Sequence, residues 1–125
     1  MPTDFEISLF HRPGTLAAAS AALGDAGINI EGQCAYVCEG HGVYHVLVSD
    51  AEGGRRTLID AGFDILAERR VAVAPVEDRP GAAAAVLSRI AAQGLSVDLV
   101  YVTANGQLAI GGDDPSAIVR ILSEA

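Results

Sequence analysis

The chain has 125 residues, half of them apolar, and a formal net charge of −8 at neutral pH. The negative charge disfavours binding to nucleic acids, and no apolar stretch approaches the ~20 residues needed to span a bilayer. The N-terminus lacks the basic segment and apolar run of a signal peptide, so we expect a cytoplasmic protein with no membrane association.

The first half of the chain predicts four strands and two helices. Residues 4–10 alternate apolar and polar side chains, which indicates a half-buried strand. Arg12-Pro13-Gly14 ends this strand, and apolar residues at helical spacing then continue to Gly27, a typical C-terminal cap. Two strands are predicted next, over residues 28–37 and 43–49, and the even-numbered residues of the first are expected to face the core. Asp50 is expected to cap a helix over residues 51–61, and extended chain is predicted over residues 63–76.

The same pattern then occurs a second time. His11-Arg12-Pro13-Gly14 returns 67 positions later as Asp78-Arg79-Pro80-Gly81. At the same offset, Gly27-Ile28-Asn29-Ile30 returns as Gly94-Leu95-Ser96-Val97. A constant spacing between two motifs indicates an internal duplication rather than chance. We therefore expect two units, residues 1–69 and residues 70–125.

The second unit is predicted to repeat the order of elements, with one strand fewer. A helix is expected over residues 80–93, with Ala83 among its inward residues, then strands over 95–103 and 107–111 and a helix opening at Asp114-Pro115. This order predicts an α+β fold of two ferredoxin-like βαββαβ units in tandem, with antiparallel sheets and helices on one face. The last strand of the second unit is expected to be missing, which leaves a bare sheet edge.

The repeated motifs resemble the ACT family of amino-acid-binding domains, and the resemblance covers nearly the whole chain. It is carried by Arg12-Pro13-Gly14-Thr15-Leu16, Ala26-Gly27-Ile28-Asn29-Ile30, Val48-Ser49-Asp50 and Asp78-Arg79-Pro80-Gly81. The order and spacing are similar to those of small free-standing tandem ACT proteins. The resemblance implies a ligand-responsive regulatory module with sites where units meet. The chain departs from the family where Ser96 replaces the asparagine and where no final strand follows.

The start of the first helix in each unit is the expected ligand site. A free amino acid needs N–H donors for its carboxylate, and unpaired N–H groups beside a glycine supply them. Asn29 and Ser96 are expected beside these loops, where they offer further hydrogen bonds. The candidate ligand-binding residues are His11, Arg12, Pro13, Gly14, Thr15, Leu16, Asn29 and Ile30 in the first unit, and Asp78, Arg79, Pro80, Gly81, Ala82, Ser96 and Val97 in the second.

Simpler explanations stay open for these residues. Pro-Gly is also a common tight turn, and a loop arginine is often only solvated. His11 and Asp78 occupy equivalent positions, so they either make two chemically unequal sites or reflect surface variation.

Two other functions are weighed against a non-enzymatic regulatory module that uses no cofactor. One is a small ferredoxin-like hydrolase, similar to acylphosphatases, that would use Arg12 and Asn29, although no Ser/His/Asp or Cys/His set is evident. The other is a purely structural subunit of a larger enzyme. As partners we expect a free amino acid or similar small ligand, a second copy of the chain in a homodimer and a metabolic enzyme.

The cysteines and histidines near the hairpin suggest zinc only weakly. Cys34 and Cys38 are expected on the core face and His45 on the opposite face, so the four groups, with His41, should not converge and no metal is expected. The outer sheet face is predicted to be apolar, because it should carry Ala35, Val37, Val43 and Leu47. Such a patch favours a homodimer.

Overall fold

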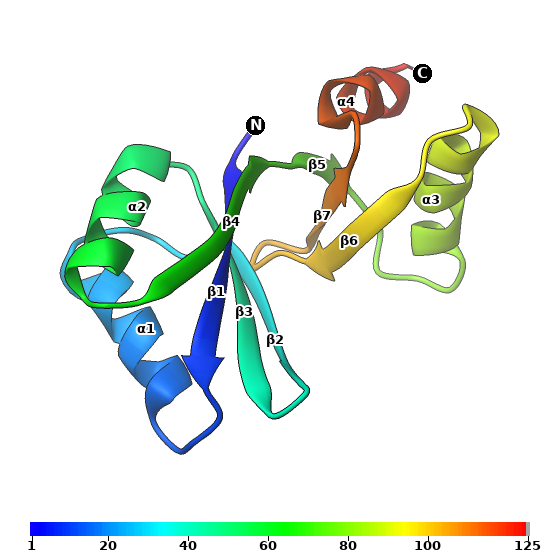
Figure 1. Cartoon of the computed structure of the whole chain (residues 1–125). Helices are drawn as coiled ribbons and strands as arrows, with labels where there is room; N and C mark the ends of the chain where they lie inside the picture. The colour runs from blue at the N-terminus through cyan, green and yellow to red at the C-terminus, as the bar shows by residue number, and fades with distance from the viewer. Residues whose placement is uncertain (125) are drawn as a thin grey trace. The chain divides into compact units, whose positions relative to one another are not determined.

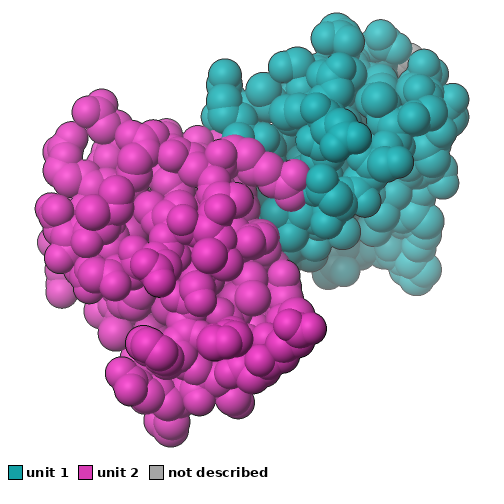
Figure 2. All heavy atoms as spheres, in the orientation of Figure 1, with its two compact units in different colours: residues 1, 70–125 teal, residues 2–69 magenta. Residues whose placement is uncertain are grey.

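The computed structural model describes residues 1–124, and the chain forms two compact units. Figure 2 colours residues 2–69, here the N-terminal unit, in magenta, and residues 1 and 70–125, here the C-terminal unit, in teal. Each unit has an antiparallel sheet with two helices, so the predicted α+β fold of tandem ferredoxin-like units is confirmed. No helix within residues 1–124 has the length and apolar character needed to cross a membrane.

The N-terminal unit has the complete βαββαβ order. Its sheet has the strand order β2-β3-β1-β4 (Figure 1). The elements are β1 (Thr3–Phe10), α1 (Thr15–Asp25), β2 (Gly32–Cys38), β3 (His41–Val48), α2 (Ala51–Asp60) and β4 (Asp64–Arg70). The alternation of β1 is confirmed, because Phe5, Ile7 and Leu9 are buried in the core beside Leu23 of α1 and Leu58 of α2.

Helix α2 contains two glycines, and the structure explains one of them. A Cβ atom on Gly54 would lie 3.1 Å from Cε2 of Phe5 and 3.2 Å from Cγ2 of Val48. The glycine therefore lets the helix approach the sheet closely. The predicted cap is confirmed, since the carboxylate of Asp50 accepts a hydrogen bond of 2.9 Å from the N–H of Gly53.

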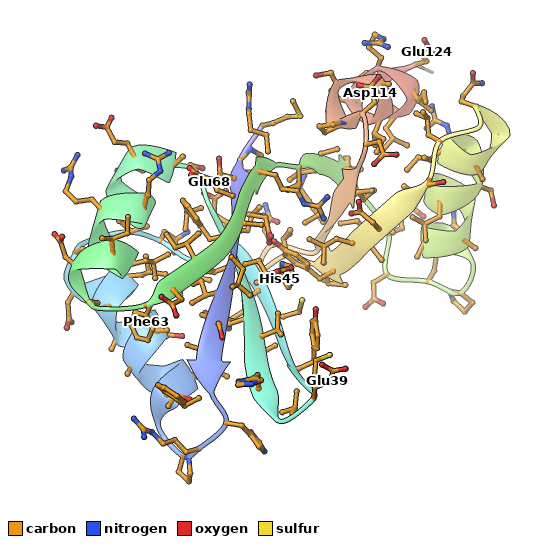
Figure 3. The ribbon with its side chains drawn as sticks, viewed as in Figure 1. Glu39, His45, Phe63, Glu68, Asp114 and Glu124 are labelled. Carbon is orange, nitrogen blue, oxygen red and sulfur yellow. The ribbon has the colours of Figure 1, made fainter. Side chains whose placement is uncertain are left out.

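The C-terminal unit repeats this arrangement with three strands in the order β5-β7-β6. Its elements are β5 (Ala72–Pro75), α3 (Ala82–Ala92), β6 (Val97–Val102), β7 (Gln107–Gly112) and α4 (Pro115–Ser123). Within residues 1–124 no strand follows α4, as predicted. Figure 3 labels Asp114 at the start of α4, where its side chain accepts from the N–H of Ala117, as expected of a cap. The prediction for Ala83 is wrong, because Ala82 is the buried residue of the first turn of α3.

The faces of β2 differ from the prediction. Cys34 pairs with His45, and Tyr36 pairs with Val43, so these even-numbered residues lie on the face away from the core. The core face of β3 carries Tyr44 and Val46. Ile28 and Ile30 do pack against the core, so the alternation slips by one residue before β2 begins. The equivalent point of the C-terminal unit is a bulge between Val97 and Leu99. A one-residue slip moves every later side chain to the other face.

Candidate ligand-binding site

The two Arg-Pro-Gly motifs form the same loop. Gly14 and Gly81 both have positive φ, +91° and +85°, and each precedes the first helix of its unit. A left-handed backbone at this point favours glycine over any residue with a Cβ. The backbone hydrogen bonds also match, from Arg12 N–H to Phe10 carbonyl at 2.9 Å and from Arg79 N–H to Glu77 carbonyl at 3.0 Å. The sequence duplication is therefore a duplication of backbone geometry.

Helices that follow these loops differ from the other two helices at their N-termini. Asp50 and Asp114 cap α2 and α4 with their side chains, whereas α1 and α3 have no side-chain cap. The glycine at the cap position leaves the first-turn N–H groups of α1 and α3 without a side-chain partner.

Each loop forms one wall of a hollow whose other wall is the hairpin of the same unit. The N-terminal hollow, of about 200 Å³, is lined by Leu9, Phe10, His11, Arg12, Thr15, Leu16, Ala35, Tyr36, Val37, Gly42 and Val43. The C-terminal hollow, of about 420 Å³, is lined by Val76, Glu77, Asp78, Arg79, Ala83, Val102, Gly106 and Leu108. Positions 9, 10, 11, 12 and 16 of the first correspond, 67 residues later, to positions 76, 77, 78, 79 and 83 of the second. The duplication therefore extends to a pair of equivalent hollows.

A further hollow of about 380 Å³ shares Leu9, Phe10, Arg12 and Thr15 with the N-terminal hollow. It extends to the segment before β4, at Gly62 and Phe63, to Asp64 at the start of β4, and to His41 at the start of β3. Figure 3 labels Phe63 in this segment and Glu39 at the tip of the β2–β3 hairpin. Arg12 therefore borders two hollows of the N-terminal unit.

The two equivalent hollows carry different charges. In the N-terminal hollow, the guanidinium carbon of Arg12 lies 5.1 Å from the centre of the Phe10 ring, and the lining contains no carboxylate. In the C-terminal hollow, Arg79 forms an ion pair with Glu77, and Asp78 adds a second carboxylate. The first hollow is cationic and largely apolar, and the second combines both signs of charge.

Asn29 and Ser96 do not lie beside the loops of their own units, so that expectation is wrong. The loop follows Phe10, which pairs with His41, whereas Asn29 precedes Gly32, which pairs with Leu47. Figure 1 shows the α1–β2 connection at the opposite end of the sheet from the β1–α1 loop. The reason is that α1 carries the chain back along β1, over roughly 1.5 Å per residue. In the C-terminal unit, Ser96 likewise follows α3 and precedes β6.

The other candidate residues divide by exposure. The loop residues are exposed, namely His11, Arg12, Pro13, Gly14, Asp78, Arg79, Pro80 and Gly81. Thr15 is half-buried, and its hydroxyl donates to the Phe10 carbonyl at 2.7 Å. Leu16 is 43% exposed at the N-terminal hollow. Ile30 and Val97 pack against the two cores, and Ala82 is buried, so these three have an evident packing role.

The hairpin residues of both hollows, and the difference at position 10, were not among the residues expected from the sequence. A signal was present, because the ferredoxin-like order places the β2–β3 hairpin at the same end of the sheet as the β1–α1 loop. The exchange of Phe10 for Glu77 was also visible at the constant offset.

Cys34 lies directly opposite His45 on one face of the sheet, so the prediction that they occupy opposite faces is wrong. His45, which Figure 3 labels, is buried, and its Nδ1 lies 2.8 Å from a carboxylate oxygen of Asp4. Burial is the main cause that raises the pKa of the Cys34 thiol, and the nearby Asp4 carboxylate raises it further. A raised pKa disfavours the thiolate form that zinc requires. The absence of zinc stays a prediction.

The prediction of an apolar patch on the outer face of the sheet is also wrong. Ala35 and Val37 pair with Tyr44 and Gly42, on the same side as the helices. Val43 and Leu47 do lie on the outer face, but Leu47 is only 1% exposed. The four residues therefore form no common patch, and this argument for a homodimer fails.

Comparison with known proteins identifies the fold. No family model matches the chain, and no curated protein matches it. A protein from Bacteroides thetaiotaomicron is similar in structure over 96% of this chain and 85% of its own, with a TM-score of 0.82 and 24% identity. The ligand-free regulatory subunit of aspartate kinase from Thermus thermophilus matches over 97% and 89%, with a TM-score of 0.70 and 16% identity. The corresponding subunit from Thermus flavus matches over 97% and 90%, with a TM-score of 0.65 and 16% identity. The chain thus has an ACT-like fold.

Proposed function

We propose that the chain is a non-enzymatic regulatory module that binds free amino acids or similar small carboxylate ligands in its two hollows. The observation that carries this proposal is the repetition of one loop, one uncapped helix start and one hollow in both units. A tight turn alone needs no hollow beside it. The proposed ligand-binding residues of the hollows are the loop residues 11–16 and 78–82. Neither hollow is lined by Asn29, Ile30, Ser96 or Val97, so a ligand contact by these four residues is proposed only outside the hollows.

The structural neighbours support a regulatory role. Two of them are regulatory subunits of aspartate kinase, and one of those was solved in a form named as ligand-free. By analogy, we propose that the present chain acts on a metabolic enzyme in the cytoplasm. The alternative hydrolase relied on Arg12 and Asn29, which lie at opposite ends of the N-terminal unit. The alternative of a purely structural subunit predicts no ligand.

The C-terminal hollow is the better match to an amino acid. An amino acid presents a carboxylate and an ammonium, and this hollow offers the guanidinium of Arg79 together with the carboxylates of Glu77 and Asp78. Charge-assisted hydrogen bonds to both groups of one ligand give orientation as well as affinity.

We also propose two domains, residues 1–69 and 70–125, and a homodimer. The argument for the dimer is that β5 lies at the edge of a three-stranded sheet within residues 1–124. An edge strand offers unpaired N–H and carbonyl groups to a second chain. Light scattering tests this, because a particle mass of 12.8 kDa, that of one chain, would exclude the dimer.

A thermal-shift screen against the twenty amino acids tests the proposed function. A ligand present at about 100 times its Kd stabilises the folded state by roughly 2.7 kcal/mol. We expect at least one amino acid to raise the melting temperature, and Arg79→Gln to reduce that shift. Arg56→Gln is the control, because Arg56 is exposed on α2 and lines neither hollow. If no amino acid shifts the melting temperature, the proposal is wrong.

A further inference from the structure

The N-terminal hollow offers a binding group for an anion. Arg12 lines it, and within residues 1–124 this side chain forms no ion pair with a carboxylate. Its guanidinium packs over the ring of Phe10, which leaves the N–H donors in the guanidinium plane available. A carboxylate is the ligand group that this planar set of donors matches.

The same hollow offers no negative charge to an ammonium, and its side-chain acceptors are limited to the His11 imidazole and the Thr15 and Tyr36 hydroxyls. No Asp, Glu, Asn or Gln lines it. The Phe10 carbonyl already accepts from the Arg12 N–H and from the Thr15 hydroxyl, and the Arg12 carbonyl accepts from that hydroxyl at 3.2 Å. A ligand ammonium here would lose water, find no carboxylate partner and lie near a positive guanidinium.

The remaining surface of the N-terminal hollow is apolar and small. Phe10, Leu16, Tyr36 and Val37 are large hydrophobic residues that are between 43% and 69% exposed, and all four line this hollow. Covering them with an apolar ligand group removes this surface from water, which is favourable. The volume of about 200 Å³ is below the 300–1,000 Å³ typical of sites for drug-sized ligands, so a small molecule is indicated.

The equivalent residues of the C-terminal hollow reverse the charge. Glu77 replaces Phe10 and pairs with Arg79, and Asp78 replaces His11. The loop backbone is the same, so the difference in charge between the two hollows comes from positions 10 and 11 and their counterparts 77 and 78.

We infer that the N-terminal hollow binds a small apolar monocarboxylate that has no ammonium. This inference rests on the proposal that the hollows bind small ligands. Arg12 holds the carboxylate, and Phe10, Leu16 and Val37 enclose the apolar chain. The protein then has one hollow for an amino acid and one for an acid that lacks the amine.

Isothermal titration of the full chain with 4-methyl-2-oxopentanoate and with leucine tests this inference. The two probes share one carbon skeleton and differ in the oxo and ammonium groups. We expect Arg12→Gln to weaken binding of the oxo acid by about 10- to 100-fold, the loss expected for a hydrogen bond to a charged group. Phe10→Glu should produce a comparable loss, because it recreates the Glu77–Arg79 ion pair next to Arg12. Arg56→Gln is the control and should leave oxo acid affinity within about twofold, because Arg56 lines neither hollow.

The outcomes separate this inference from the proposed function. If leucine or another amino acid binds through Arg79 and the oxo acid does not bind, the inference is wrong and the proposed function stands. If no probe and no amino acid binds, both are wrong. Equal weakening of leucine and oxo acid by Arg12→Gln would also overturn the inference, because the hollow would then accept an ammonium. Arg12 is exposed, so circular dichroism should show an unchanged fold in the variant.

Discussion

The two units share one backbone loop and differ in the chemistry around it. Gly14 and Gly81 have nearly the same φ, yet the arginine beside one packs on a ring and the arginine beside the other forms an ion pair. The difference arises from single exchanges at positions 10 and 11. The comparison shows that two copies of a loop can keep the same backbone conformation, which depends on a few residues such as the glycine, while the side chains around it differ.

The cores of the two units also differ in their side chains although the elements correspond. Phe5 and Ile7 of β1 correspond, at the offset of 67, to Ala72 and Ala74 of β5. The N-terminal unit also has a fourth strand, β4, which has no counterpart after α4 within residues 1–124. The N-terminal unit therefore buries larger side chains under a wider sheet.

The largest expected effect comes from making the N-terminal core resemble the C-terminal one. Phe5→Ala should destabilise the N-terminal unit by about 3–5 kcal/mol, because it removes a fully buried ring and leaves a cavity. Urea titration followed by NMR signals of β1 and β3 measures the free energy of unfolding of this unit. Leu66→Ala is the control, since Leu66 is 56% exposed and should change stability little. A loss below about 1 kcal/mol for Phe5→Ala would contradict the described core.

Next in size is a test of whether the two loops are equivalent. Gly14→Ala and Gly81→Ala should each cost about 1–2 kcal/mol, because a Cβ is strained at positive φ although no atom lies within 4 Å of it. Gly24→Ala lies within α1 and also has no atom within 4 Å, so it should instead stabilise by up to about 1 kcal/mol. Thermal unfolding checks all three variants. If the two loop variants lost clearly different amounts of stability, the two loops would not be equivalent.

A smaller effect is expected from the capped helices. Asp50→Ala and Asp114→Ala each remove a side chain that accepts from a first-turn N–H, at 2.9 Å and 3.0 Å. Each should destabilise its unit by about 1 kcal/mol. Equilibrium unfolding in urea measures the free energy of unfolding of each variant. The two variants can be compared directly because each removes the N-terminal cap of the second helix of its unit. No change in either variant would show that the caps are not formed in solution.

The smallest effect concerns a contact that only the N-terminal unit can make. Arg55 of α2 donates to Glu68 of β4, with Nε 2.9 Å from the carboxylate. The hydrogen bond from Arg55 lowers the pKa of the Glu68 carboxyl. A lowered pKa contributes stability above the ordinary carboxyl pKa, and this contribution is lost as the pH falls through the lowered value. Both side chains are partly exposed, so solvent screens the pair and the stabilisation at neutral pH should be small.

Arg55→Gln should raise the pKa of Glu68 towards its ordinary value, and an NMR titration of the side-chain carboxyl measures it. Arg56→Gln, one residue away on α2, serves as the control because Arg56 pairs with Glu52 instead. An unchanged titration of Glu68 in the Arg55 variant would mean that the α2–β4 contact is not populated.

Local features of the fold were predictable from the sequence because they depend on neighbouring residues. The alternation in β1, the caps at Asp50 and Asp114, and the duplicated elements follow from local periodicity and cap chemistry. Gly27 and Gly94 end their helices with positive φ for the same reason, and N–H groups of the residues that follow them return to the carbonyls of Leu23 and Ile90.

Only the tertiary structure decided which side chains share a surface. A one-residue slip before β2 placed Cys34 opposite His45, and no periodicity in the segment revealed the slip. The return of the chain along α1 placed Asn29 at the far end of the sheet and brought Tyr36 and Val37 to the loop instead. The sequence determined the two loops and their charges, since these are local. The hollows depend on strand register and chain direction, which are set by contacts between residues distant in sequence.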